Sequence, residues 1–439
     1  MSLREYLEKT PDNKPVSKSD TGYSKQKFDL RDALYHRMSS ERIANLLAHD
    51  KASAEREVTA VLEQLTLDHL YQGHDPRQRE LLIQAVLNLV VGLGPLEDLL
   101  DDPSVTEIMV NGHSHVFYEQ EGRLFESSIV FDDEEQLRLV IDRIVGPLGR
   151  RVDEQSPLVS ARLEQGHRVN VVIPPLALDG PILTIRKFRD EIFTLTELIG
   201  KGSLDAQIAQ LLRWAVLIRK NIAVSGGTGG GKTTLLNALS VEIPSNERII
   251  TIEDAAELRF SAHPHVVRLE ARMKNIEGSG EVTIRDLVVN ALRMRPDRIV
   301  VGECRGAEAI DMLQAMNTGH DGSLTTLHAN SPADVISRLV MMSRFGMDLP
   351  VEVIEEQIGS ALDLIVQIDR FADGSRHITQ ICSCHSSRGN IELKSLVTWD
   401  KPSGTYVWTA LPSWLDDSLQ NPLIQAEEVE IWRSSLQLS

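Results

Sequence analysis

The sequence predicts an α/β protein whose C-terminal half is built on a mostly parallel sheet, preceded by a helical segment and an α+β N-terminal domain. After residue 190, short aliphatic strands alternate with helical patterns, which is typical of a parallel sheet covered by helices on both faces. Before it, apolar residues repeat at helical spacing over 52–90 and are followed by strand-like segments at 106–110, 162–173 and 182–188.

These patterns divide the 439 residues into four segments. Residues 1–50 have few aliphatic clusters, so we expect a flexible arm. Residues 51–190 form the helical and α+β domain, and 191–400 form the parallel-sheet domain with a strand-rich C-terminal subregion. The tail, 401–439, is rich in tryptophan. Its aromatic side chains either cap the core or bind a partner, and we favour capping because aromatic residues bury large areas.

Composition narrows the function classes. The formal net charge is −18, which argues against a chain-wide nucleic-acid surface, so we expect no nucleic-acid partner. Three cysteines are too few for a disulfide framework. No stretch approaches the roughly 20 apolar residues that span a bilayer, and the first residues lack the apolar run of a signal peptide. We therefore expect a cytoplasmic protein.

The strongest motif is a full match to the phosphate-loop pattern, placed directly after one predicted strand and at the start of a helix. Its glycines let backbone N–H groups face phosphates, its lysine reaches the β and γ oxygens, and its threonine hydroxyl holds Mg²⁺. ATP and Mg²⁺ are therefore the predicted cofactors. The candidate nucleotide-binding residues are Gly226, Gly227, Thr228, Gly229, Gly230, Gly231, Lys232, Thr233 and Thr234.

Acidic residues follow two further predicted strands. Glu253 and Asp254 come after one strand, and Glu303 ends another, behind Gly302 where an Asp would be expected. Because ligands bind at the carboxyl edge of such sheets, Glu253 or Glu303 is a candidate for activating water. Asp254 and Glu303, with Thr233, are the candidate metal ligands. The alternative for the first acidic pair is capping of a following helix.

Histidine and arginine complete the candidate catalytic set. His328 ends a strand and could bind the γ-phosphate, although a lone histidine is usually structural. Phosphoryl transfer gains from a guanidinium that meets charge developing in the transition state, although most arginines form surface ion pairs. The candidate arginines are Arg162, Arg168, Arg186, Arg268 and Arg272.

The four motifs, in this order behind such an N-terminal domain, resemble the secretion ATPase superfamily of type II and type IV secretion systems and pilus motors. More narrowly, four short segments resemble the CpaF branch, which assembles Flp (Tad, tight-adherence) pili. The resemblance covers about 60–395. The four segments are GLGPL at 92–96, EIMVNG at 107–112, RRVD at 150–153 and LTIRKF at 183–188.

This resemblance implies a hexameric ATPase whose subunits pair an N-terminal domain with a RecA-like phosphate-loop domain. The family's Walker A, Asp, Walker B and His boxes then fall on 226–233, 253–257, 299–303 and 319–328. It also implies polytopic inner-membrane pilus platform proteins as partners, pilin as an indirect partner, and a cytoplasmic location peripheral to the inner membrane.

Two other functions stay open at this point. One is a type IV secretion traffic ATPase that drives substrate or DNA export. The other is a nucleotide-gated docking platform with little turnover.

Overall fold

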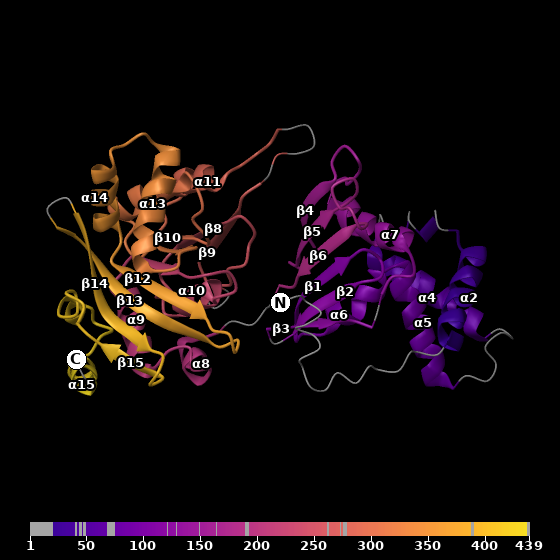
Figure 1. Ribbon diagram of the computed structural model, residues 1–439, viewed down its shortest axis with the longest axis horizontal. Coiled ribbons are helices and arrows are strands. Elements are labelled where there is room, and N and C mark those ends of the chain that lie inside the picture. The colour runs from indigo at the N-terminus through magenta and orange to yellow at the C-terminus, as the bar shows by residue number, and fades with distance from the viewer. Residues whose placement is uncertain are drawn as a thin grey trace. The chain divides into compact units, whose positions relative to one another are not determined.

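The computed structural model divides the chain into two compact units, Met1–Arg189 and Asp190–Ser439, which are described separately below (Figure 1). The residues described are 21–39, 42, 43, 46, 50–67, 75–120, 122–128, 130–148, 150–163, 165–188, 193–260, 263–272, 274, 279–387 and 390–436.

Among its described residues, the N-terminal unit starts with three helices around a small apolar core: α2 (Thr21–Arg37), α4 (Lys51–Leu67) and α5 (Pro76–Val90). The expectation of a flexible arm over 1–50 is wrong for α2. Leu30 and Leu34, one helical turn apart, are fully buried in this core, which stabilises the helix by tertiary packing. The first twenty residues of the expected arm lie outside the described residues.

A six-stranded antiparallel sheet follows, with strand order β3-β2-β1-β6-β5-β4. Helix α7 packs its apolar face, including Leu137, Ile141 and Ile144, into the same core as this sheet. The elements are η2 (Gly94–Leu96), α6 (Glu97–Asp101), β1 (Val105–Asn111), β2 (Val116–Gln120), β3 (Arg123–Glu126), α7 (Glu134–Val145), η3 (Gly146–Leu148), β4 (Leu158–Arg162), β5 (Arg168–Val172) and β6 (Ile182–Arg186).

The C-terminal unit is built on a nine-stranded sheet with strand order β15-β14-β13-β12-β7-β11-β10-β8-β9. The strands from β12 to β9 in this order pair in parallel, whereas β13, β14 and β15 add an antiparallel extension. The predicted mostly parallel sheet is therefore confirmed. Its strands are β7 (Ile222–Ser225), β8 (Ile249–Glu253), β9 (Val266–Glu270), β10 (Arg298–Val301), β11 (Leu324–Leu327), β12 (Leu364–Arg370), β13 (Arg376–Ser387), β14 (Asn390–Asp400) and β15 (Thr405–Trp408).

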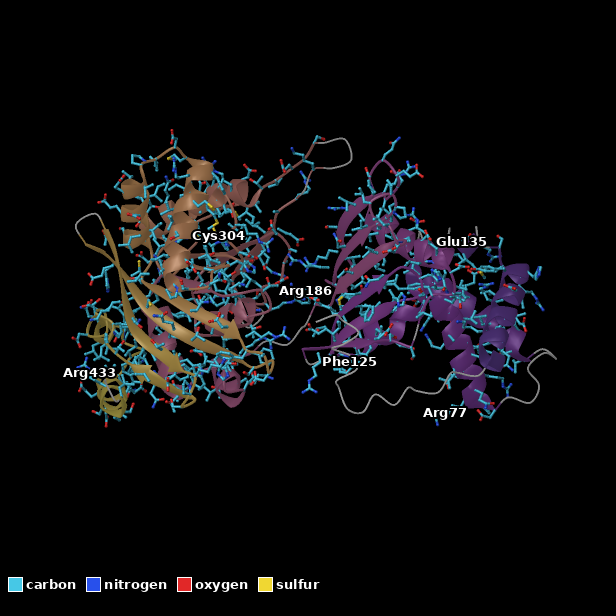
Figure 2. All side chains as sticks on the ribbon, in the orientation of Figure 1. Arg77, Phe125, Glu135, Arg186, Cys304 and Arg433 are labelled. Atoms are coloured by element: carbon cyan, nitrogen blue, oxygen red, sulfur yellow. The ribbon has the colours of Figure 1, made fainter. Side chains whose placement is uncertain are left out.

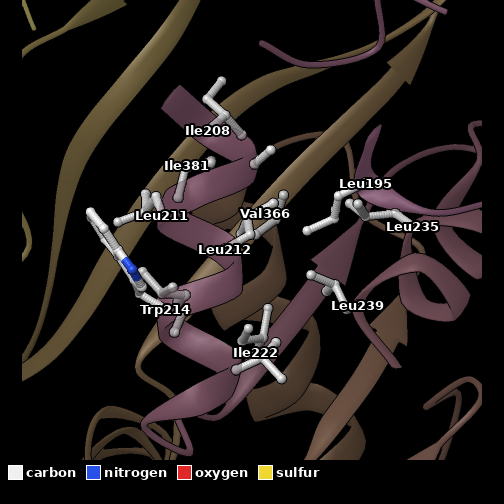
Figure 3. Packing of buried hydrophobic residues seen from close by; sticks show 14 of the residues in the cluster. Leu195, Ile208, Leu211, Leu212, Trp214, Ile222, Leu235, Leu239, Val366 and Ile381 are labelled. Carbon is white, nitrogen blue, oxygen red and sulfur yellow. The ribbon is translucent and has the colours of Figure 1, made fainter. Parts of the chain in front are cut away.

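Helices cover both faces of this sheet because its central strands are apolar on both sides. Ile222 and Val224 of β7 join one core, which α9 and α10 complete, and Ala223 joins the other. Figure 3 shows Ile222 in the first core with Leu212 of α9 and Leu239 of α10. The helices of this unit are α8 (Leu195–Gly200), α9 (Ala206–Leu217), α10 (Lys232–Val241), α11 (Ile284–Ala291), α12 (Glu308–Asn317), α13 (Pro332–Gly346), α14 (Val351–Ala361), η4 (Asp417–Gln420) and α15 (Ala426–Ser435).

A fully buried arginine links the amino ends of the sheet strands. Arg298, the first residue of β10, donates to both carboxylate oxygens of Glu247, at 2.5 and 3.2 Å. It also donates to the carbonyl oxygens of Val216 at the end of α9 and Gly322 just before β11. The edge of the sheet opposite the strands' carboxyl ends is thereby held together by one side chain.

The tail belongs to the core of the C-terminal unit. Trp408, Trp414 and Trp432 are each at most 5% exposed and lie in the cluster that α9 completes. Trp432 meets the rings of Trp214 and Trp408 edge-on, each at 5.3 Å, and donates from Nε1 to the carbonyl oxygen of Gln207 at 2.9 Å. The expectation that these aromatics cap the core is confirmed.

Within the described residues, no single helix is long and apolar enough to cross a membrane. One bent pair of consecutive segments, Pro76–Val90 and Gly94–Asp101, meets that test by length and composition together, with a bend of 120° between them.

We expect Trp432→Ala to destabilise the C-terminal unit by about 3–5 kcal/mol, because it removes a large buried ring from a three-tryptophan contact. All five tryptophans lie in this unit, so denaturant unfolding followed by tryptophan fluorescence reports on it alone. Ile431→Ala, on the same helix and 64% exposed, is the control and should change the unfolding free energy by at most about 0.5 kcal/mol. Equal effects of the two variants would contradict this account of the tail.

Candidate functional site

The phosphate loop connects β7 to α10, and its backbone needs glycine. A Cβ on Gly226 would lie 2.1 Å from the carbonyl oxygen of Ile368, so the loop passes directly against β12. Gly231, the residue before α10, has φ 100°, a left-handed conformation that glycine adopts without strain. Together these positions hold the loop in a tight turn at the N-terminus of α10, where backbone N–H groups favour an anion.

Lys232 is almost completely buried and lies across this loop. Its Nζ donates to the carbonyl oxygens of Gly226 at 3.0 Å and Gly227 at 2.9 Å. The same Nζ lies 3.5 Å from Nδ1 of His328, at the end of the neighbouring strand β11. The structure thus brings two predicted site residues, far apart in the sequence, to the same place.

His328 joins Lys232 to the next acidic residue. Its Nε2 lies 2.8 Å from Oε1 of Glu303, which follows β10. Burial lowers the pKa of His328, and the nearby charge of Lys232 lowers it further, so the ring is neutral at neutral pH. The pair is close but not hydrogen-bonded, because Oε1 of Glu303 is buried without a hydrogen-bond partner. Nδ1 of the ring faces the ammonium group of Lys232.

Glu303 has a second partner that the sequence analysis missed. Arg305 donates to Glu303 Oε2 at 2.5 Å and lies 3.4 Å from Asp254 Oδ2. It therefore connects the acidic residues that follow β8 and β10. In the sequence, only its position two residues after Glu303 could have identified Arg305 as a site residue.

Glu253 lies inside the protein and uses one of its two oxygens for local structure. Its Oε1 accepts N–H groups of Glu257 and Leu258, each at 2.8 Å. Its Oε2 is buried with no hydrogen-bond partner, and burial raises the pKa of Glu253 to about 7. The alternative expectation was that Glu253 caps a following helix. Its side chain does accept backbone N–H groups of the residues that follow it, but these residues are not helical.

The missing aspartate beside Glu303 has a steric explanation. A Cβ on Gly302 would lie 2.7 Å from Cγ of Glu253, on the neighbouring strand. Any side chain at Gly302 would thus displace Glu253, so the carboxylate here comes from β8 rather than β10.

The remaining residues of the loop differ in their exposure to solvent. Gly227 and Thr228 are exposed, whereas Thr233 and Thr234 are half-buried in the first turn of α10. The loop closes on itself through a hydrogen bond from Gly230 N–H to the carbonyl oxygen of Gly227.

Three predicted arginines lie in the N-terminal unit, and the antiparallel register places them in one row. Arg162 of β4 is directly opposite Arg168 of β5, which is directly opposite Arg186 of β6. Arg186 also lies 3.7 Å from Glu107 of β1, and its side chain is 48% exposed. The sequence identified these residues by type, whereas the row results from strand pairing.

The other two predicted arginines lie in the C-terminal unit. Arg268 of β9 contributes a positive charge that opposes the effect of burial on the pKa of Glu253. Arg272 instead supports a local loop, because its Nε donates to the carbonyl oxygen of Gly280 at 2.6 Å. The structure therefore brings Arg268, but not Arg272, into the electrostatic environment of the acidic residues.

Two further arginines, which no sequence motif indicated, lie next to the phosphate loop. Arg376 donates from Nε to the carbonyl oxygen of Gly229 at 2.9 Å, and Arg370 lies close to the same glycine. Both belong to the hairpin formed by β12 and β13.

The chain matches the Type II/IV secretion system protein family over residues 90–397. A putative conjugal transfer protein of Mycobacterium tuberculosis is 38% identical over 321 residues, which cover 72% of this chain and 90% of that protein. Type IV secretion system protein VirB11 of Brucella suis is 34% identical over 321 residues, with coverage of 66% and 88%.

Among solved structures, the chain is similar to the VirB11 ATPase of the Brucella suis type IV secretion system, crystallised with sulphate. The two are 32% identical, the match covers 66% of this chain and 95% of that one, and the TM-score is 0.37.

We expect the stabilising effect of Glu253→Gln to grow with pH. The Glu253 carboxyl keeps its proton in the folded protein up to about pH 7 but releases it near 4.5 when unfolded, so its contribution to stability is lost as pH rises. Glutamine does not titrate. The difference in unfolding free energy between variant and wild type should therefore rise between pH 5 and pH 8, by up to about 3 kcal/mol.

Denaturant unfolding at the two pH values measures this difference, and any constant cost of the amide cancels. Glu356→Gln, an exposed carboxylate on α14, is the control and should show no such rise. A pH-independent difference for Glu253→Gln would mean that Glu253 is charged in the folded protein.

Proposed function

Because this chain belongs to the Type II/IV secretion system protein family and is a secretion ATPase, we propose that its phosphate loop, acidic residues and His328 form the hydrolysis site of a molecular motor. The observation that supports this best is the connected series Lys232, His328 and Glu303 at the carboxyl ends of adjacent strands. Residues of the Walker A, Walker B and His boxes thus contact one another.

The residues present fit a nucleotide. The loop has a glycine at each point where a side chain would strike β12 or strain the turn, so backbone N–H groups can face phosphates. Lys232 holds its ammonium group over the loop, where it can exchange the carbonyl oxygens of Gly226 and Gly227 for phosphate oxygens. The loop therefore already has the backbone conformation for nucleotide binding, whereas Lys232 would give up its two carbonyl contacts.

Mg²⁺, when bound with the nucleotide, would neutralise charge on the phosphates. In phosphate sites this ion takes one or two protein oxygens and keeps phosphate and water oxygens for the rest. Thr233 at the start of α10 and Glu303 are the residues that fit this role. Asp254 is the third candidate. Its carboxylate pairs with Arg305, so it is less available to a metal ion than the other two residues.

Glu253 and Glu303 are the two candidates for activating water. Glu253 has a pKa near 7 and a buried oxygen without a partner, which suits a general base at neutral pH. Glu303 is more accessible and is held by Arg305 and His328. His328, neutral and between Lys232 and Glu303, is placed to report a change at the lysine to the carboxylate, which is the proposed γ-phosphate sensing.

We assign the motor to the assembly of Flp-type pili, on the resemblance of the N-terminal segments at 92–96, 107–112, 150–153 and 183–188 to the CpaF branch. The partners are then polytopic inner-membrane platform proteins and, through them, pilin. The protein would work in the cytoplasm at the inner membrane as a homohexamer.

A second candidate function is a type IV secretion traffic ATPase, which the names of the conjugal transfer and VirB11 relatives favour. Neighbouring genes for prepilin, prepilin peptidase and secretin would support pilus assembly. Neighbouring relaxase and coupling-protein genes would support the alternative. A docking platform with little turnover is the third reading, and steady-state ATP hydrolysis by the purified protein would exclude it.

We expect Lys232→Ala to abolish nucleotide binding or turnover, because the variant loses the cation that lies over the loop.

Glu253→Gln and Glu303→Gln should instead retain ATP and lose hydrolysis, by about a hundredfold or more for the general base, since each keeps its shape but loses its negative charge. Equilibrium nucleotide binding and steady-state phosphate release measure the two properties separately.

Glu356→Gln serves as the control for both measurements. If only one glutamate variant loses hydrolysis, that residue is the base and the other belongs to the metal or structural set. Normal hydrolysis in both variants would refute the acidic part of the mechanism, and normal hydrolysis in Lys232→Ala would refute the assignment of the loop.

We expect hydrolysis to depend on assembly, because Arg186 and its row lie in the N-terminal unit and would act on nucleotide at subunit boundaries of a ring. Specific activity should rise with protein concentration as hexamers form in ATP. Arg186→Ala subunits should bind ATP yet lower activity when mixed into wild-type rings. Turnover by a demonstrated monomer that is independent of concentration would contradict the ring but leave the loop chemistry intact.

A further inference from the structure

The hairpin of β12 and β13 extends beyond the strand that carries the phosphate loop. β12 runs parallel to β7, with Gln367 opposite Ser225, the last residue of β7. The next residue, Ile368, places its carbonyl oxygen where a side chain on Gly226 would have to lie. The end of the hairpin therefore lies alongside the loop itself.

The tip of this hairpin brings two arginines together. Arg370, the last residue of β12, is directly opposite Arg376, the first residue of β13. The turn between them is closed by hydrogen bonds from Phe371 N–H to the carbonyl oxygen of Ser375, at 2.8 Å, and from Gly374 N–H to that of Phe371, at 3.0 Å. Both arginine side chains therefore extend from a turn that two backbone hydrogen bonds hold closed.

Arg376 bonds to the phosphate loop, and Arg370 lies next to the same part of it. Arg376 Nε donates to the carbonyl oxygen of Gly229 at 2.9 Å, and its Cδ would lie 3.2 Å from a Cβ on Gly231. A Cβ on Gly229 would lie 3.5 Å from Nη1 of Arg370. Glycine at these two positions leaves room for the arginine side chains as well as for an anion.

Like charges directly opposite each other on antiparallel strands destabilise a hairpin. Here they lie beside a loop that also carries the ammonium group of Lys232, so three basic side chains are near one short segment. An anion of high charge density reduces this repulsion, and a guanidinium binds phosphate oxygens strongly and with defined geometry.

We propose that Arg370 and Arg376 form an arginine clasp, a second cationic element of the same subunit that sets the affinity of the loop for polyphosphates. Arg376 positions the loop through Gly229, and both guanidinium groups attract the phosphates electrostatically. This inference rests on the proposed function of the loop as the nucleotide site. It concerns binding, whereas the arginine row of the N-terminal unit was assigned to catalysis.

The test is the equilibrium affinity of the full-length protein for ADP, measured by calorimetry at two salt concentrations. Arg376→Ala should weaken binding by about tenfold or more, since it removes a hydrogen bond and a charge next to phosphate. Arg370→Ala should weaken it less, and Arg376→Lys should recover part of the loss because it restores the charge without the Nε–H. The salt dependence of binding should decrease in both alanine variants.

Arg213→Ala is the matched control, because it removes one arginine charge that pairs with Glu242 at the C-terminal end of α10, away from the loop at the other end. Its affinity for ADP should equal that of the wild type. Unchanged melting temperatures would confirm that all variants are folded.

The outcomes separate this inference from the proposed function. A wild-type protein that does not bind ADP refutes the nucleotide site itself. A wild-type protein that binds ADP, with Arg370→Ala and Arg376→Ala binding equally well, refutes the clasp alone. An Arg376→Lys variant as weak as Arg376→Ala, with unchanged salt dependence, would also overturn the clasp, because it would limit Arg376 to supporting the loop.

Discussion

The buried pair of Arg298 and Glu247 is the interaction on which the arrangement of the C-terminal unit depends. It ties the start of β10 to α9 and to the turn before β11 at the amino edge of the sheet, where no candidate functional residue lies. Loss of one partner would leave an uncompensated buried charge, which typically costs about 3–5 kcal/mol. With this edge fixed, the opposite edge can hold several charged groups close together without carrying the stability of the sheet. Cys304, the neighbour of Glu303 in the sequence, marks this part of the C-terminal unit in Figure 2.

The sequence predicted the phosphate loop and the polar strand ends because these depend on local spacing and on the rule that parallel strands end at one edge. It did not predict that the side chain of Glu253 on β8 occupies the space beside Gly302 on the neighbouring strand. That arrangement depends on which side chain fills a gap between two adjacent strands. Arg376 was equally invisible, since its contact with Gly229 joins residues 147 positions apart. Helix α2 was missed because its composition is polar and only tertiary packing reveals its apolar side.

The arginines also show that a sequence does not reveal contacts between distant residues. Residue type alone selected five candidates, and the structure divides them according to what each side chain meets. Arg162, Arg168 and Arg186 share a row because antiparallel pairing aligns them, whereas Arg272 is engaged by its own loop. Arg305, absent from the candidates, bridges Glu303 and Asp254. Strand register and local hydrogen bonding, neither of which the sequence specifies clearly, therefore determine which residues each of these arginines lies next to.

The contacts of Lys232 have a consequence for product release. Its ammonium group already donates to two carbonyl oxygens of its own loop, so at the proposed nucleotide site a phosphate would have to compete with these oxygens. This internal competitor lowers the net gain from binding and is available again as soon as the product loosens. An ATPase whose site must empty in every cycle would benefit from this competition, because tightly held ADP would stop turnover.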